Sequence, residues 1–344
     1  MCSTSGVRTP GSFRHSPAGL RGPDFAGPQP RASYAGDHCC CSHPRKGCFS
    51  VNLALGLLLG IGALVGGFVA EGGHVEVLWQ PFEFLIIGGI AIGVFVMGNP
   101  FSTIIDAGKG VVEALTNATP KRKDFLALLS LLFALMRDLR SRPRNEVEAH
   151  IDNPNESPLF QHFPGILKDK ELTQFICDYV RLTIIGNARS HEIEALMEQE
   201  ISTIRKHKLK PQASMGTISE ALPALGICAA VLGIVKAMGA LDESPEVLGE
   251  YIGAALIGTL TGIFWSYAVV SPLAQLIKIT REKQMQCFII VKQTIIAFMN
   301  GALPQIALEH GRKTISSSER PTIDEVENEA ISTSPAAEPM KRAA

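Results

Sequence analysis

The chain has 344 residues, of which 46% are hydrophobic, and its 32 Lys and Arg residues nearly balance its 33 Asp and Glu residues. The net charge of −1 excludes a general attraction to nucleic acid and other polyanions. The mean hydropathy is nevertheless +0.18, although the first fifty and the last thirty residues are polar. The apolar residues are therefore concentrated in between, which indicates membrane-spanning segments.

Residues 1–50 differ in composition from the rest of the chain. They contain six Pro, seven Gly and six Arg or Lys residues and cannot bury a core. They are not a signal peptide, because no apolar stretch begins before Leu53. Their candidate metal ligands are His38, Cys39, Cys40, Cys41, His43 and Cys48. Zinc sites need paired ligands with a second pair elsewhere. We therefore favour a disordered or non-native extension over a zinc site, and we predict no bound metal or cofactor.

Four stretches are apolar and long enough to cross a bilayer, namely residues 53–70, 84–105, 221–240 and 252–277. The third carries one charged residue, Lys236, near one end, from which a long side chain can reach the interface. A fifth apolar stretch, from Phe125 to Met136, has only twelve residues with charges on both sides. This length favours a buried or interfacial helix over a fifth span.

The distribution of Lys and Arg predicts the topology. Neither the loop before the second span nor the loop at residues 241–251 contains one, whereas residues 99–215 contain sixteen. This bias places the middle segment and both termini in the cytoplasm. The predicted fold is all-α, with four transmembrane helices and a helical cytoplasmic domain inserted between spans two and three. The predicted segments are a transmembrane hairpin at 51–105, the cytoplasmic domain at 106–215, a second hairpin at 216–277, a cytoplasmic helical segment at 278–315 and a flexible tail at 316–344.

Known catalytic motifs are missing from the sequence. Gly108-Lys109-Gly110 lacks the other residues of a P-loop, and His191-Glu192 lacks the second histidine of a zinc-protease motif. We therefore predict that the chain is not an enzyme. The inner parts of the spans contain no Asp, Glu or His, and Glu83 lies only at the outer edge of the second span. Because ion carriers usually need an intramembrane carboxylate, another subunit must supply it if this chain conducts ions.

Prolines and hydroxyl residues interrupt the third and fourth spans. Pro223 and Pro272 each remove a backbone hydrogen bond, which creates either a hinge lining a polar path or an ordinary kink. Thr259, Thr261 and Ser266 can offer hydroxyls to such a path or bond back to their own helix.

Small residues four positions apart allow close packing within the chain or between subunits. The pairs are Gly56 and Gly60, Gly62 and Gly66, Gly89 and Gly93, Ala229 and Gly233, and Gly258 and Gly262.

Several runs resemble, in order, the MotA family of stator subunits of the bacterial flagellar motor. They are ALVGGFVAEGGHVEVLWQPFEFLIIGG, IDNPNESPLF, EIEALMEQEI, LPALGICAAVLGIVKAMG, GTLTGIFWSYAVVSPLA and HGRKTISSSERP. The resemblance covers about Val51 to Asp324 and implies a proton-conducting subunit in the bacterial inner membrane. It also implies a ring of five copies around two MotB chains, which bring the membrane aspartate and the peptidoglycan anchor. The ring would turn against the rotor protein FliG.

The same resemblance assigns roles to particular residues. Pro223 and Pro272 match prolines that couple ion flow to movement, and Thr259 matches a threonine of the ion pathway. Ala230 falls where sodium-driven relatives tend to carry threonine, which favours protons.

Arg140 and Glu148 match charges that face the rotor, although residues 141–147 are more charged than is usual in the family. Two alternatives remain. A TolQ- or ExbB-like energy-transducing subunit would have three spans and no SSERP segment. A small-molecule transporter would be expected to show an internal repeat and polar residues at mid-membrane.

Overall fold

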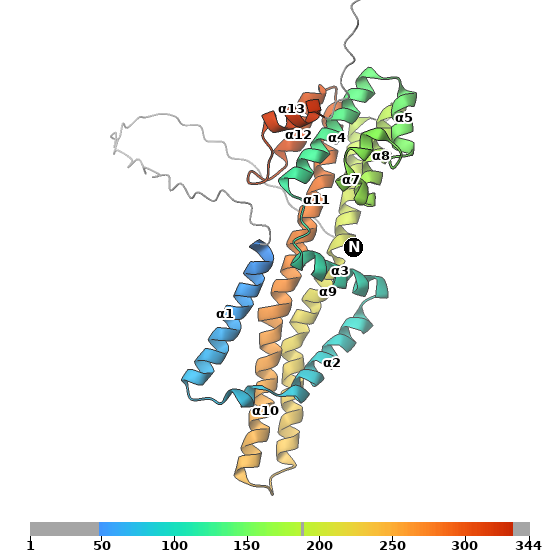
Figure 1. Cartoon of the computed structure of the whole chain (residues 1–344). Helices are drawn as coiled ribbons and strands as arrows, with labels where there is room; N and C mark the ends of the chain where they lie inside the picture. Colours follow the sequence, from blue (N-terminus) through green and yellow to red (C-terminus); the bar gives the residue numbers. More distant parts are fainter. Residues whose placement is uncertain (1–47, 187–188, 333–344) are drawn as a thin grey trace, which may run out of the picture. The chain divides into compact units, whose positions relative to one another are not determined.

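The computed structural model describes residues 48–186 and 189–332, which belong to one compact unit, Lys46–Ala344. The described residues form helices and no strand, which confirms the all-α prediction (Figure 1). The cysteine and histidine cluster at residues 38–43 lies outside the described residues. The elements are α1 (Cys48–Ala70), η1 (Val75–Leu78), α2 (Pro81–Gly98), α3 (Phe101–Leu115), α4 (Arg122–Ser141), α5 (Arg144–Asp152), α6 (Pro158–Gln161), α7 (Pro164–Lys168), α8 (Lys170–Ile185), α9 (Ser190–Met238), α10 (Pro245–Phe264), the π-helical turn η2 (Trp265–Val270), α11 (Ser271–Met299), α12 (Pro304–Lys313) and α13 (Ile323–Ser332).

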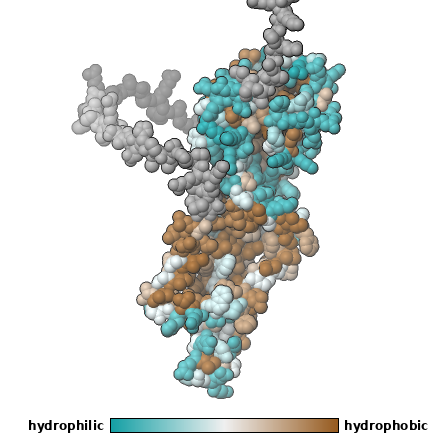
Figure 2. Space-filling model, in the orientation of Figure 1, coloured by the Kyte–Doolittle hydropathy of each residue, from teal (hydrophilic) through white to brown (hydrophobic). Residues whose placement is uncertain are grey.

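Four helical segments of the described chain are long and apolar enough to cross a membrane, which confirms the predicted number of spans. They lie in α1, in η1 with α2, in α9, and in the continuous stretch from α10 to α11. Figure 2 shows that hydrophobic side chains gather in a broad region over this part of the molecule, and that the end carrying α4, α5, α12 and α13 is hydrophilic. The chain is a multi-pass membrane protein.

The second span lies closer to the N-terminus than predicted. It ends at Gly98, whereas the absence of charge had suggested an end near Ile105. Pro100 has no N–H to continue the helix and disfavours helical backbone in the residue before it. Asn99 is accordingly extended, with φ −134° and ψ 141°, and Pro100 becomes the N-cap of the separate helix α3.

Two long helical stretches run through the predicted segment boundaries. α9 is continuous for 49 residues, so the boundary at 215/216 lies inside it. α10, η2 and α11 follow one another without a break from Pro245 to Met299, so the boundary at 277/278 lies inside this stretch. At 1.5 Å per residue, α9 is about 70 Å long, roughly twice the thickness of the hydrocarbon core. These helices therefore connect the membrane part of the chain to the region outside it.

The main hydrophobic core lies outside the apolar spans and joins α4, α5, α8 and α12 to the ends of α9 and α11. The fifth apolar stretch belongs to this core as part of α4. Phe125, Leu128 and Leu132 are each only 1% exposed, which confirms the prediction of a buried helix. Each such side chain contributes about 1.5–3 kcal/mol through burial, so α4 is held firmly in place.

The C-terminal segment differs from the predicted flexible tail, because Ile323–Ser332 form the helix α13. The buried guanidinium of Arg312 donates to the Glu309 carboxylate at 2.6 Å and to the carbonyl oxygen of Pro321 at 2.8 Å. α13 follows and buries Val326 in the main core, while Glu325 pairs with Arg122 of α4 at 2.5 Å. The composition of this segment suggested a tail, because only a few of its side chains make the anchoring contacts and the composition does not reveal them.

Replacing Arg312 by Ala should release α13. The change leaves the Pro321 carbonyl and Glu309 without their partner, which should cost about 2 kcal/mol. We expect glutamyl endopeptidase to cut the purified protein after Glu325 at least tenfold faster than it cuts wild type. Lys313→Ala, which alters the exposed neighbouring residue, should leave the cleavage rate unchanged. Equal cleavage of all three proteins would show that Arg312 does not anchor the segment.

Candidate functional site

α9 and α10 approach each other more closely than side chains would allow. A Cβ atom on Gly262 would lie 2.7 Å from the carbonyl oxygen of Leu222 and 2.8 Å from the Cα of Gly226. A Cβ on Gly233 would lie 2.6 Å from the Cβ of Ala255. Glycine at these positions is what allows the two backbones to touch. We call this contact, from Leu222 to Gly233 on α9 and from Ala255 to Gly262 on α10, the glycine seam.

Two buried serines extend the glycine seam toward α11. The Ser219 hydroxyl donates to the carbonyl oxygen of Ser266 at 3.1 Å, and the Ser266 hydroxyl donates to the carbonyl oxygen of Ser219 at 2.5 Å. Ser266 lies in η2, a π-helical turn, and such turns occur often at functional sites. The sequence had suggested only that Ser266 offers a hydroxyl, and it gave no sign that Ser219 would be the partner.

The structure brings together three of the four predicted pathway residues. Ala230 is buried in the glycine seam, and the carbonyl oxygen of Thr259 lies 3.3 Å from the position of a Cβ on Gly226. Pro223 lies within α9 at the Leu222 end of the glycine seam, four residues after Ser219.

Pro272 lies apart from the other three. It stands in the first turn of α11, directly after η2, and lines a cleft of about 460 Å³ together with Leu53 and Leu57 of α1. The two prolines therefore lie at different helix contacts.

The predicted small-residue pairs fall into two groups. The pairs on α9 and α10 form the glycine seam. At the pairs on α1 and α2, an added Cβ would meet no other described atom within 4 Å. These glycines are Gly56, Gly60, Gly62, Gly66, Gly89 and Gly93. The packing of the described chain on itself does not need them.

Glu83 is buried, whereas its position at the edge of the predicted span did not suggest burial. It lies on one face of α2 with Ile87 and Ala91, and these three residues are only 9%, 3% and 8% exposed. Its Oε2 atom lies 2.9 Å from the position of a Cβ on Gly258 in the glycine seam. The spacing of four and eight residues was the available signal, because such residues share a helix face.

Arg140 and Glu148 both lie on helices. Arg140 is in the last turn of α4 and Glu148 is in the middle of α5, with Pro143 as the N-cap of α5 between them. Both are exposed, and neither forms an ion pair with another described residue. Val147, next to Glu148, is fully buried, so α5 presents its charges outward.

Asp138 holds the turn between these helices and was not singled out from the sequence. It is 4% exposed, and its Oδ1 lies 3.5 Å from the Nε of Arg137 and 3.6 Å from the Nε of Arg142. The backbone N–H of Arg142 also donates to the Asp138 carbonyl at 2.9 Å. A buried carboxylate between two guanidinium groups therefore stabilises the turn between α4 and α5.

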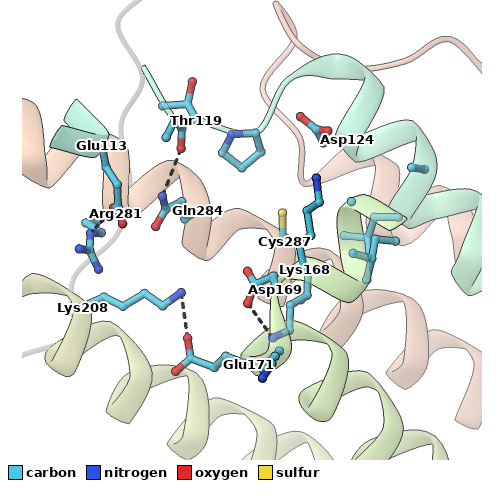
Figure 3. A pocket seen from close by; sticks show the side chains of 18 of the residues that line it. Glu113, Thr119, Asp124, Lys168, Asp169, Glu171, Lys208, Arg281, Gln284 and Cys287 are labelled. Carbon is cyan, nitrogen blue, oxygen red and sulfur yellow. Dashed lines mark hydrogen bonds and ion pairs between the residues drawn. The ribbon is translucent and has the colours of Figure 1, made fainter. Parts of the chain in front are cut away.

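A cavity of about 1020 Å³ lies between the α3–α4 connection, α7, α8, α9 and α11 (Figure 3). Ion pairs cross it. Lys208 pairs with Glu171 at 2.9 Å, while Arg281 pairs with Glu113 at 3.0 Å and with Asp106 at 3.1 Å. Arg281 thereby ties α11 to α3. No sequence signal indicated this clamp, because Asp106 and Arg281 are 175 positions apart.

Helix α3 is amphipathic. Phe101, Ile105 and Val112 are 78%, 60% and 60% exposed, while Ala107 and Ala114 on the opposite face are buried. A helix of this kind, at the end of a membrane span, is suited to lie in the plane of the membrane interface.

Two ionisable groups of the main core, Cys177 and Tyr179, have raised pKa values. Burial, with the nearby charge of Asp178, raises the pKa of the Cys177 thiol to about 11. Burial and the hydrogen bond to Glu200 at 2.6 Å raise the pKa of Tyr179. Both groups stay protonated at neutral pH, so Cys177 is no thiolate nucleophile.

Comparisons with known proteins give consistent matches. Residues 54–143 match the family model described as Motility protein A N-terminal, and residues 168–288 match the MotA/TolQ/ExbB proton channel family. The chain is 41% identical to Motility protein A of Salmonella typhimurium over 80% of this chain and 93% of that protein. It is 35% identical to the chemotaxis protein LafT of Vibrio parahaemolyticus, over 79% and 96% of the two chains.

Two solved structures have a similar fold. One is the structure of C. jejuni MotAB, with a TM-score of 0.63, 20% identity, and coverage of 79% of this chain and 98% of that one. The other is the flagellar MotAB stator complex from Bacillus subtilis, with a TM-score of 0.58, 21% identity, and coverage of 78% and 96%.

Proposed function

This chain belongs to the motility protein A family, within the MotA/TolQ/ExbB proton channels, and we propose that it is a proton-conducting stator subunit of a bacterial flagellar motor. The observation that carries the proposal is the 41% identity with a motility protein A over 93% of that protein's length. Four apolar helices, instead of the three of TolQ- and ExbB-like subunits, also favour the stator over that alternative.

A MotB partner completes the ion pathway in this proposal. The similar structures are complexes of MotA with MotB, and the interior of the spans here offers no central carboxylate. MotB would supply the membrane aspartate and the peptidoglycan anchor. Further copies of this chain would cover the open glycine faces of α1 and α2, in a ring of five by family resemblance.

Pro223, Pro272, Thr259 and Ala230 would lie along or beside the proton pathway. Prolines leave carbonyl oxygens free and weaken the helix locally, so a change of charge on the partner's aspartate can shift the helix there. α9 and α11 both continue into the main core, so such a shift would move α4 and α5 with them. This continuity supports the conversion of proton flow into movement.

Arg140 and Glu148 would meet the rotor protein FliG. Their exposure and their lack of an ion-pair partner in the described part of the chain support this role. The Lys and Arg distribution supports an inner-membrane orientation with the main core and both termini in the cytoplasm.

Swimming should depend on protons and not on sodium. Ala230 offers no hydroxyl where a sodium-type relative would have one, and hard cations need several oxygen ligands. We expect this chain, expressed with its MotB in a strain without stator genes, to restore swimming. A protonophore should then stop the cells, and replacing external sodium by potassium should leave their speed unchanged. Swimming speed that follows sodium concentration would refute proton coupling, and failure to swim at normal protein levels would refute the stator role.

A further inference from the structure

Glu83 breaks the pattern of the helix face on which it lies. The other buried residues of this face, Ile87 and Ala91, are apolar and pack against α9. An apolar residue is therefore expected at position 83 as well. A buried carboxyl without compensation lowers stability, and residues that break a local rule in this way tend to be functional.

No group in the described chain forms a hydrogen bond or an ion pair with the Glu83 carboxyl. Its Oε2 atom is buried and has no hydrogen-bond partner among residues 48–186 and 189–332. The carboxylates of Asp106 and Glu113 differ from it, because the fixed guanidinium of Arg281 holds both of them. An unpaired carboxyl can gain and lose a proton without breaking an ion pair.

The charged groups around Glu83 are few. Among the described residues, the charge that acts on Glu83 is that of Lys236 on α9, and the Lys236 amine lies 4.1 Å above the ring of Tyr251 instead of pairing with the carboxyl. α10 carries no charged residue between positions 252 and 264. In the outer loop that precedes α2, Glu76 and His74 are exposed to solvent.

Glu83 also lies beside the predicted pathway. A Cβ atom on Gly258 would lie 2.9 Å from the Oε2 atom of Glu83 and 3.5 Å from the backbone nitrogen of Ala230. Thr259 is the next residue along α10. The missing side chain of Gly258 thus makes room for the carboxyl against the glycine seam, on the side from which α2 enters the membrane.

We propose that Glu83 is a proton-relaying carboxyl at the outer end of the ion pathway. The proposal rests on the proton conduction proposed above. A hydronium ion from the outer solution transfers its proton to a carboxylate oxygen of Glu83, which forms an O–H bond and leaves a water molecule. The carboxyl then transfers that proton to a water molecule on the pathway side and becomes a carboxylate again. No oxidation or reduction accompanies the two transfers.

Rotation of tethered cells tests the proposal in the assembled motor. Glu83→Gln keeps the shape of the side chain but cannot relay a proton, so rotation should slow more than tenfold while the amount of complex with MotB stays normal. Glu83→Asp should retain rotation with an altered dependence on external pH. Glu76→Gln, which removes an exposed carboxylate from the same outer loop, should behave as wild type. Rotation of Glu83→Gln at wild-type speed, with protons still the coupling ion, would overturn the relay and leave the stator function intact.

A second measurement uses the wild-type complex, so it does not depend on any variant assembling. Dicyclohexylcarbodiimide reacts with protonated carboxyls in apolar surroundings. Mass spectrometry of the treated complex should find the adduct on Glu83 and not on Glu71 or Glu76. A Glu83 that stays unlabelled would overturn the proposal. If the wild-type chain restored no rotation at all, the proposed stator function would be wrong. Labelling of Glu83 would then still show whether this carboxyl is protonated in apolar surroundings.

Discussion

Gly262→Val should abolish motility and lower the amount of this protein in the membrane several-fold. The added carbons would meet the carbonyl oxygen of Leu222 and the Cα of Gly226, and these backbone atoms cannot rotate away as a side chain can. Overpacking of this kind costs typically about 1–3 kcal/mol, and we expect the upper end of that range here. Immunoblots of membrane fractions and swimming assays in a strain without stator genes measure both effects.

Gly249→Val is the matched control on the same helix. A Cβ at Gly249 would meet no other described atom within 4 Å, so the substitution should leave the protein level and the swimming speed near wild type. Gly262→Ala, which adds a single methyl group at the seam, should fall between the two valine variants. Equal behaviour of Gly262→Val and Gly249→Val would show that the glycine seam is not the close contact described above.

Reversing the charge of Arg140 or Glu148 should reduce swimming strongly and leave the fold intact. Exposed charges without partners contribute less than about 1 kcal/mol to stability, so Arg140→Glu and Glu148→Lys should accumulate normally and co-purify with MotB. At an interface, like charges brought together can cost several kcal/mol, which would prevent engagement of the rotor. Swimming speed measures the effect on the motor, whereas protein level and co-purification with MotB measure any effect on the fold and assembly.

A compensating charge reversal on FliG should restore part of the swimming. Lys313→Glu is the control, because Lys313 is an exposed cation on α12 and has no predicted contact with the rotor. It should swim normally. Degradation of the Arg140 or Glu148 variants would assign a structural role to these charges. Normal swimming of these variants at both low and high salt would show that Arg140 and Glu148 do not contact the rotor.

Local sequence patterns determined the fold class, the number of spans and the burial of α4. These features depend on the hydropathy of consecutive residues, and Phe125 to Met136 was too short to cross a membrane whatever its surroundings. The same patterns misplaced two ends. Uncharged residues suggested a second span up to Ile105, because a count of charges does not detect the helix break at Pro100. The polar composition after Ser316 suggested a tail, because it does not reveal the few contacts of Arg312 that hold α13.

The tertiary structure alone decided which of these residues meet. Five small-residue pairs looked alike in the sequence, yet only those on α9 and α10 form a close contact, because the relative rotation of two helices selects the faces that touch. The same choice of faces buries Glu83 against Gly258 and pairs Ser219 with Ser266, and the fold brings Arg281 to Asp106. Periodicity identifies a helix and its apolar face, whereas contacts between residues far apart along the chain depend on how the helices pack together.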